Sequence, residues 1–115
     1  MLRLRGGGGY DVKRAYYIWG VPAQIERGFH AHRNLKQQCF CVCGNVDFVL
    51  DNGREREFVH LGALEKSVSI GNNIWREMKN FSHDAMVLVF ANKVYDENDY
   101  IHDYQQFLKE VESEL

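Results

Sequence analysis

The sequence has little proline, little cysteine and no excess of basic residues. One proline and three cysteines occur in 115 residues, and 14 Lys and Arg stand against 16 Asp and Glu. A net charge of −2 supplies no positive field for a nucleic acid backbone, so nucleic acid is not an expected partner. No apolar run approaches the ~20 residues that span a bilayer, and no charged-then-apolar leader is evident. We therefore expect no membrane association.

The three cysteines are crowded into one short segment. Cys39, Cys41 and Cys43 alternate with apolar residues, which is poor geometry for a disulfide framework. This usage predicts a cytoplasmic protein. By strand alternation the three thiols share a face with Gln37 and point into the fold, where we expect them to act as small apolar fillers.

The remaining composition is that of one folded domain. Hydrophobic residues make up 45% of the chain and aromatic residues 13%, enough for a core and too much for a disordered chain. Residues 1–11 contain four adjacent glycines, Gly6 to Gly9, and are predicted to form a flexible arm. Residues 12–115 are predicted to form the domain.

Most of the domain has the pattern of short strands separated by turns. Asp51-Asn52-Gly53 indicates a hairpin, because Asn-Gly accepts the positive φ angles of a type I′ turn. Ala85 to Ala91 is apolar on both faces, as in a central strand. The predicted strands are Val12–Trp19, Gly28–His32, Gln37–Val42, Val46–Leu50, Glu57–Leu61, the segment around Val68 and Ile70, and Ala85–Ala91.

The C-terminal segment has a different period. Asp96 to Asp99 supplies candidate N-cap residues, and Ile101, Tyr104, Leu108 and Val111 then recur at helical spacing. This pattern predicts one amphipathic helix packed on the outside of the strands. The fold class is therefore all-β, a small barrel with one C-terminal α-helix.

The strongest candidate for a functional site is Gly28-Phe29-His30-Ala31-His32. His30 and His32 are two apart on a predicted strand, so their side chains share a face. Gln37 follows five residues later, and Gly44 after that. This order resembles the first motif of the cupin (jelly-roll) barrels, in which His-x-His precedes a Glu and then a Gly.

The second cupin motif ends in a His followed, after three residues, by Asn. Arg76-Glu77-Met78-Lys79-Asn80 keeps that spacing but carries Arg76 in place of the His. Metal-binding cupins use three histidines and the Glu. Gln37 is a weak ligand and Arg76 a fixed cation, so we expect no metal and no other cofactor. The histidines are then available to transfer protons.

Four separated segments carry a narrower resemblance. They resemble the sugar nucleotide 3,4-ketoisomerases, cupin enzymes that act on dTDP-4-keto-6-deoxy-D-glucose, and the resemblance covers nearly the whole chain. It implies a metal-free isomerisation through an enediol that gives the 3-keto sugar for bacterial deoxyamino sugar synthesis. The segments are Val12–Ile18, Arg27–His32, Asn73–Met78 and Tyr95–Ile101.

The resemblance also suggests roles for individual residues. His30 is the expected carbon base and Tyr16 the acid or relay, with His32 shaping the pocket or sharing the relay. Tyr17 remains an alternative to Tyr16, because adjacent strand residues face opposite sides and only one of them is expected to face the cavity.

The remaining candidates would bind substrate. Arg27 and Arg76 are expected to hold the diphosphate or position the sugar, since guanidinium binds phosphate oxygens bidentately. Gln37 completes the substrate-binding set. Family members carry either His or Arg at the place of Arg76, and this implies an influence on the configuration at C4 of the product.

Members of the family carry further strands before Val12, often within a dimer contact, so this chain is expected to be N-terminally shortened and homodimeric. An open strand edge invites pairing with another chain. Three alternative functions remain open: a non-catalytic sugar nucleotide binder, a metal-dependent oxygenase and a related epimerase.

Overall fold

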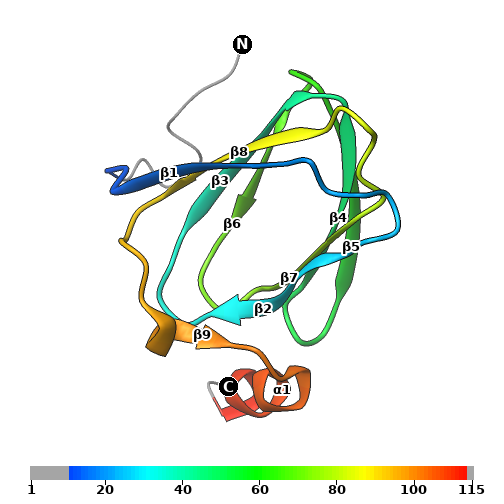
Figure 1. Cartoon of the computed structure of the whole chain (residues 1–115). Helices are drawn as coiled ribbons and strands as arrows, with labels where there is room; N and C mark the ends of the chain where they lie inside the picture. Colours follow the sequence, from blue (N-terminus) through cyan, green and yellow to red (C-terminus); the bar gives the residue numbers. More distant parts are fainter. Residues whose placement is uncertain (1–10, 114–115) are drawn as a thin grey trace.

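Two antiparallel sheets face one another and enclose the core. The computed structural model describes residues 11–113. One sheet has the strand order β1-β8-β3-β6 and the other β5-β4-β7-β2-β9, which gives the jelly-roll barrel seen in Figure 1. The strands are β1 (Arg14–Trp19), β2 (Arg27–His32), β3 (Gln37–Cys43), β4 (Asn45–Asp51), β5 (Arg56–Gly62), β6 (Ser67–Ile70), β7 (Trp75–Lys79), β8 (Met86–Ala91) and β9 (Tyr100–Ile101).

The predicted fold class is confirmed, and each predicted strand is present within a few residues of its expected bounds. The segment predicted to be a central strand, β8, lies between β1 and β3. Two strands were not predicted. Trp75–Lys79 has no clean alternation because four of its five residues are buried, and β9 is only two residues long. The arm expected over residues 1–11 lies almost wholly outside the described residues.

The β4–β5 turn differs from the prediction. Asp51 pairs with Arg56, which leaves four residues in the loop. Gly53 has a φ of +93°, but Asn52 has no positive φ. Instead, the Asn52 side chain accepts hydrogen bonds from the backbone N–H groups of Arg54 and Glu55 at 2.9 and 2.8 Å. A type I′ turn is therefore wrong here, because an Asx-type loop satisfies the backbone instead.

The core between the sheets follows strand alternation, with one correction in β3. Cys39 and Cys41 point inward and are buried, but Cys43 is exposed. The pairing of β3 with β8 shifts between Cys41 and Cys43, so that Cys43 lies opposite Met86 instead of an inward residue. Because of this β-bulge, the Cys43 side chain points outward instead of into the barrel. The interior is filled mainly by Val46, Phe48, Leu61, Phe81, Val87 and Val89.

The helix α1 (Tyr104–Ser113) covers the outer face of the second sheet, beneath β2 and β9 in Figure 1. Phe107 packs there against Trp75, Ala31 and Ile101. The expected N-cap position is wrong. Asp103 caps the helix by accepting from the N–H groups of Gln105 and Gln106, whereas Asp96 caps a 3₁₀ turn at Glu97–Asp99. Ile101 belongs to β9 and not to the helix.

No helix within residues 11–113 combines the length and the apolar character that crossing a membrane requires.

Candidate active site

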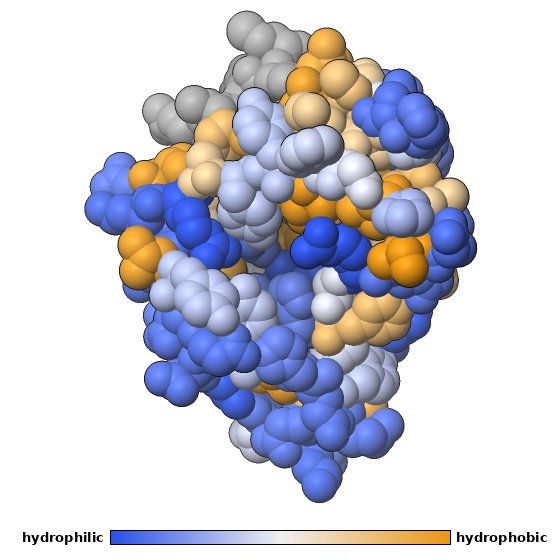
Figure 2. All heavy atoms as spheres, in the orientation of Figure 1, coloured by the Kyte–Doolittle hydropathy of each residue, from blue (hydrophilic) through white to orange (hydrophobic). Residues whose placement is uncertain are grey.

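A cavity of about 380 Å³ opens between the two sheets. Figure 2 shows the hollow with apolar side chains inside it and hydrophilic ones around it. Three arginines line the cavity, and no Asp or Glu does so among the described residues. The arginine, tyrosine, histidine and glutamine side chains that line it are Arg14, Tyr16, Tyr17, Arg27, His30, Gln37, Arg76 and Tyr100. A chain of net negative charge thus surrounds this cavity with positive charge, and because it contains most of the predicted site residues we term it the main cavity.

A bulge in β2 directs His30 into this cavity. The pairing of β2 with β7 shifts between Gly28 and His30, and His30 then lies opposite Arg76. Gly28 has a φ of +90° and Phe29 one of +56°. A Cβ at Gly28 would lie 2.9 Å from the carbonyl oxygen of Arg76, so the position requires glycine for space as well as for conformation. Left-handed backbone at a non-glycine residue such as Phe29 is typical of functional sites.

His30 is poised as a neutral base. Burial, with Arg76 as the next cause, lowers its pKa from 6.5 to about 4. The ring is therefore uncharged at neutral pH. Its Nδ1 lies 3.0 Å from the carbonyl oxygen of Gly28, so in the neutral ring Nδ1–H donates to that carbonyl. Nε2 is then the nitrogen able to accept a proton.

His32 lies behind His30. The two rings meet edge to face with centroids 4.8 Å apart, so the predicted shared face is confirmed. His32 is only 3% exposed. Burial and Arg76 lower its pKa to about 2. It does not line the main cavity but a second one of about 230 Å³, where its Nδ1 lies 3.6 Å from an Asp99 oxygen.

Tyr16 is the inward-facing member of the tyrosine pair. In β1 the side chains of Arg14, Tyr16 and Ile18 are partly buried, and those between them are exposed. Tyr17 is 54% exposed and reaches the cavity only at its rim. Burial raises the pKa of the Tyr16 phenol, which keeps the hydroxyl protonated. Of the two tyrosines, Tyr16 is therefore the one whose side chain faces inward, and its role as acid or relay stays a prediction.

A hydrogen-bonded chain joins Tyr16 to Arg76. Nε2 of Gln37 donates to the Tyr16 hydroxyl at 3.1 Å, and Nη1 of Arg76 donates to Oε1 of Gln37. The amide thus connects β1 with β7 across the barrel. Because both ends of the Gln37 amide are engaged, its orientation is determined, and the Tyr16 hydroxyl is free to donate into the cavity.

Arg76 is buried without a counter-charge. It is 3% exposed, and its Nε and Nη2 donate to the carbonyl oxygen of Ile74 at 3.3 and 3.2 Å. Within residues 11–113 it forms no ion pair with a carboxylate. Burial lowers its pKa to about 10, so the charge persists at neutral pH. An unneutralised buried cation is costly and implies an anionic ligand or transition state.

The sequence-predicted site is largely assembled in one place. His30, Tyr16, Gln37 and Arg76 converge on the cavity, while Arg27 and Tyr17 line its exposed margin. His32 is adjacent but outside it.

Two further residues were missed. Arg14 and Tyr100 both line the main cavity. The Tyr100 ring lies 4.9 Å from the ring of His30 and 4.2 Å from that of His32. Tyr100 was missed because the two-residue strand β9 has no sequence signal. Arg14 was detectable, since it shares the inward face of β1 with Tyr16.

The four cupin metal positions hold an unsuitable donor set. Gln37 uses its amide oxygen to accept from Arg76, and the guanidinium occupies the place of the third histidine. In the described part of the chain, no group of three or more His, Cys, Asp or Glu side chains could hold a metal ion. The site residues fit proton transfer better than metal binding.

Comparison with known proteins gives a consistent set of matches. The WxcM-like, C-terminal (FdtA) family model matches residues 8–112. A curated relative, the TDP-4-oxo-6-deoxy-alpha-D-glucose-3,4-oxoisomerase of Aneurinibacillus thermoaerophilus, is 36% identical over 102 residues, which cover 89% of this chain and 73% of the relative.

Two solved structures are equally similar in fold. A 3,4-ketoisomerase from Helicobacter canadensis is 41% identical with a TM-score of 0.87, covering 90% of this chain and 77% of that one. QdtA, a sugar 3,4-ketoisomerase from Thermoanaerobacterium thermosaccharolyticum solved in complex with TDP, is 36% identical with a TM-score of 0.87. This match covers 91% of this chain and 77% of that one. The chain is thus shorter than each of these relatives.

Proposed function

Because the chain belongs to the WxcM-like (FdtA) family of sugar nucleotide 3,4-ketoisomerases, we propose that it converts TDP-4-keto-6-deoxyglucose into its 3-keto isomer. One observation carries this proposal for the site. A neutral histidine and a protonated tyrosine share a cavity lined by three arginines and, in residues 11–113, by no carboxylate. Such a cavity suits an anionic substrate that exchanges protons between neighbouring carbons.

The reaction starts at C3 of the sugar, where the adjacent C4 carbonyl acidifies the hydrogen. Nε2 of His30 removes this proton, and the C3–H electron pair forms the C3–C4 double bond of an enediolate. Arg76 and the Tyr16 hydroxyl stabilise the charge that develops on the C4 oxygen. These groups are already oriented by Gln37, so little reorganisation is needed.

The second half of the reaction reverses these steps at the neighbouring carbon. Tyr16 delivers a proton to the C4 oxygen and recovers one from the C3 hydroxyl, so that a carbonyl forms at C3. The proton on His30 exchanges with solvent, and His30 then delivers a proton to C4. The reaction neither gains nor loses atoms or electrons, and needs no oxidant. Arg76 disfavours the protonated form of His30, which promotes release of the proton.

Arg27 lines the exposed margin of the cavity. We assign it to the diphosphate of the substrate, since guanidinium groups bind phosphate oxygens bidentately. His32 is assigned a supporting role. Buried and neutral, it packs against the ring of His30 and restricts its orientation.

The decisive experiment is incubation with TDP-4-keto-6-deoxyglucose in deuterated water, followed at C3 and C4 by NMR. We expect a 3-keto product with deuterium at C4, and the same spectrum reports the configuration at that carbon. His30→Ala should reduce the turnover rate by at least about 10²-fold while the protein remains folded. His83→Ala is the matched control, because His83 is exposed and lies outside the cavity.

The second candidate is a sugar nucleotide binder without catalysis. It is favoured by the same arginines, which would hold a nucleotide whether or not turnover occurs. Saturable TDP binding without a 3-keto product or deuterium exchange would support this candidate and overturn the isomerase. Full activity in His30→Ala would instead overturn the assignment of the base.

We also propose that the protein is a cytoplasmic homodimer. The free cysteines suit a reducing compartment. β1 is an edge strand, and Trp19 on its outer face is 68% exposed. An exposed strand edge with aromatic side chains favours pairing with a second chain. Sedimentation equilibrium, with Trp19→Lys as the disrupting variant, tests the dimer.

A further inference from the structure

Tyr100 packs against both histidines of the site although it lies on a strand of two residues. Its ring centroid lies 4.9 Å from that of His30 and 4.2 Å from that of His32. β9 is the last strand of its sheet and pairs with β2 through Ala31–Ile101 and His32–Tyr100. Two residue pairs form a weak ladder, so the position of the Tyr100 ring depends on further contacts.

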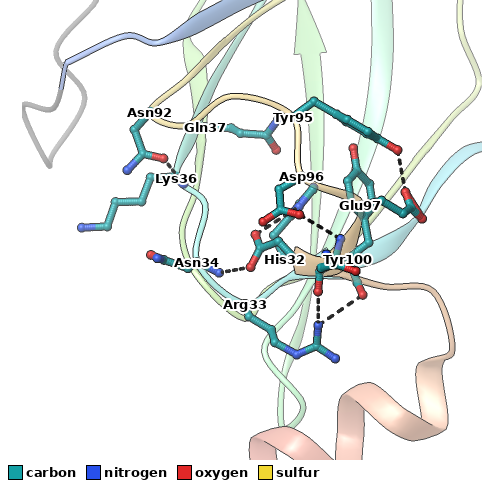
Figure 3. Close-up of polar contacts among 12 residues, drawn as sticks. His32, Arg33, Asn34, Lys36, Gln37, Asn92, Tyr95, Asp96, Glu97 and Tyr100 are labelled. Carbon is teal, nitrogen blue, oxygen red and sulfur yellow. Dashed lines mark hydrogen bonds and ion pairs between the residues drawn. The ribbon is translucent and has the colours of Figure 1, made fainter.

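Arg33, which directly follows β2, supplies such contacts. Its Nη1 donates to the carbonyl oxygens of Asn98 at 2.8 Å and Tyr100 at 3.4 Å (Figure 3). Its backbone N–H donates to the carbonyl oxygen of Asp99 at 3.1 Å. The next residue, Asn34, donates its N–H to the Asp99 carboxylate at 2.9 Å. Three consecutive residues that lead into β9 are thereby attached to the end of β2.

The other edge of the same guanidinium binds helix α1. Nε and Nη2 of Arg33 donate to the two carboxylate oxygens of Glu110 at 2.8 and 2.9 Å, which is a bidentate pair. Gln106, one turn earlier on the helix, donates to one of these oxygens at 3.0 Å. The hydrogen bond from Arg33 lowers the pKa of Glu110, so the carboxylate is ionised at neutral pH. The guanidinium thus joins β2, α1 and residues 97–101.

The contacts of Arg33 specify geometry more than they add global stability. The side chain is 43% exposed and that of Glu110 25% exposed, and an exposed ion pair contributes little to the free energy of unfolding. Four hydrogen bonds nevertheless fix the guanidinium between a carboxylate and two carbonyl groups. The feature that they place is the backbone of Tyr100, and with it the ring that packs on His30.

We propose that Arg33 is a positioning residue for the isomerisation, which holds Tyr100 against His30 and His32 and so keeps the His30 ring oriented toward the main cavity. The inference rests on the proposed function in giving His30 the role of the base. The hydrogen bond of Nδ1 with the Gly28 carbonyl oxygen leaves that ring free to tilt. The rings of Tyr100 and His32 restrict the tilt, and a displacement of about 1 Å in a reacting group can cost on the order of 10²-fold in rate.

The first test is the kinetics of Arg33→Met with TDP-4-keto-6-deoxyglucose. We expect kcat to fall by about tenfold or more and KM to change by less than about twofold, because the arginines of the main cavity remain. Arg33→Lys should recover part of the rate, since lysine lacks the planar fork. Arg54→Met is the matched control, because it removes the same charge from an exposed position outside the main cavity.

The helix side of the contact has its own pair of variants. Glu110→Gln weakens the bidentate pair but leaves the bonds from Arg33 to the carbonyl oxygens, so kcat should fall less than in Arg33→Met. Glu112→Gln removes the same charge from an exposed position on the same helix and should leave kcat unchanged.

An NMR titration of the histidines tests the placement of the His30 ring without turnover. Arg33→Met loosens Tyr100, so water should reach the ring and its pKa should rise from about 4 toward 6.5. In Arg54→Met, His30 should titrate as in the unmodified protein. The charged or ionisable groups around this ring, all retained in Arg33→Met, are Arg76, His32, Glu97, Tyr100 and His102.

A double variant shows whether Arg33 acts through Tyr100. Adding Arg33→Met to Tyr100→Ala should cause little further loss of kcat, because the ring that Arg33 positions is already absent. Losses that multiply would overturn the proposal, as would an unmodified kcat and His30 titration in Arg33→Met. Circular dichroism checks folding, and Arg33→Lys and Glu110→Gln provide the comparison if Arg33→Met unfolds.

The two proposals fail in different ways. A shifted His30 titration in Arg33→Met, in a protein that does not isomerise the sugar, would support the positioning role and refute the isomerase. Isomerisation by the unmodified protein, with the same kcat in Arg33→Met, would support the isomerase and refute the positioning role.

Discussion

Arg76 and Glu77 are neighbours on β7, carry opposite charges and are almost equally buried, at 3% and 6% exposed. Their surroundings are nevertheless opposite. Arg76 points into the barrel and, among the described residues, donates to neutral oxygens of Gln37 and Ile74. Glu77 points outward and accepts from Nε1 of Trp75 at 3.0 Å, with Lys79 and Arg56 at 3.3 and 3.6 Å.

The contrast assigns a structural role to Glu77 and a functional role to its neighbour Arg76. A buried charge that is fully paired, such as Glu77, fixes the packing of the elements around it. A buried charge left without a counter-ion destabilises the fold, and is retained where a ligand or transition state supplies the missing charge. The buried charge on the outer face of the second sheet is thus paired, whereas the buried charge on the inner face has no counter-ion among the described residues.

The largest effect should follow from Arg76→Met. We expect kcat/KM to fall by about 10²–10³-fold, because the charge that stabilises the enediolate is lost. Arg76 also contributes to the lowered pKa of His30. The acid limb of the kcat/KM profile should therefore move upward from about pH 4 toward 6.5, as measured by rates between pH 4 and 8.

Thermal stability is the control for that variant. The melting temperature should change little, since losing a donor to Gln37 is offset by no longer burying an unpaired cation. Arg76→Lys should retain the low acid limb but recover only part of the rate. An unchanged rate in Arg76→Met would show that the Arg76 charge, like that of Glu77, does not contribute to catalysis. The proposed difference between the two residues would then not hold.

The converse variant, Glu77→Leu, should affect stability and spare chemistry. We expect a loss of about 2–3 kcal/mol in the free energy of unfolding, since Trp75, Lys79 and Arg56 lose their shared acceptor. Glu77→Gln keeps an acceptor for Trp75 and should cost less. Urea unfolding measures both, and turnover per folded molecule should remain unchanged. A selective loss of kcat would contradict the purely structural role.

Acid should weaken the inner face before the outer one. His30 and His32 have folded-state pKa values of about 4 and about 2, below the ordinary 6.5. Unfolding therefore binds protons below pH 6.5, and stability falls as pH decreases from 6.5 toward 4, by at most about 3 kcal/mol for each histidine. Asp51 has a lowered pKa, so its contribution is lost only below about 3.8. In His32→Asn, the melting temperature should fall less steeply between pH 6.5 and pH 4, and thermal melts at several pH values measure this.

Sequence reasoning recovered the fold and the inner face better than the outer one. Alternation correctly predicted that His30 shares a face with His32 and that Gln37 faces inward. It left Tyr16 and Tyr17 as alternatives, because the two neighbours have the same side chain. It did not reveal the Gly28–Phe29 bulge, since the positive φ of Phe29 is imposed by pairing with β7 and has no local signature. It also failed at Cys43, where another bulge changes the facing.

The outer network was beyond local pattern for a different reason. Asp51, Glu77 and Tyr104 come from β4, β7 and α1, and only the tertiary fold brings them together. Arg76 was predicted to be a substrate ligand from its place in a motif, but its burial without a counter-ion became visible only in the structure.

The smallest effect tests how the outer network anchors the helix. The Tyr104 hydroxyl donates to Asp51 at 2.6 Å, and Arg56 binds the same carboxylate oxygen at 2.9 Å. Tyr104→Phe removes one hydrogen bond but leaves Arg56 on the carboxylate, so we expect a loss of about 1 kcal/mol. Hydrogen exchange should show faster opening of α1 alone, with the rates for β2 and β7 unchanged. Equal acceleration in β7 would mean that the helix and the cavity wall open together, and the separation between the two faces of that strand would not hold.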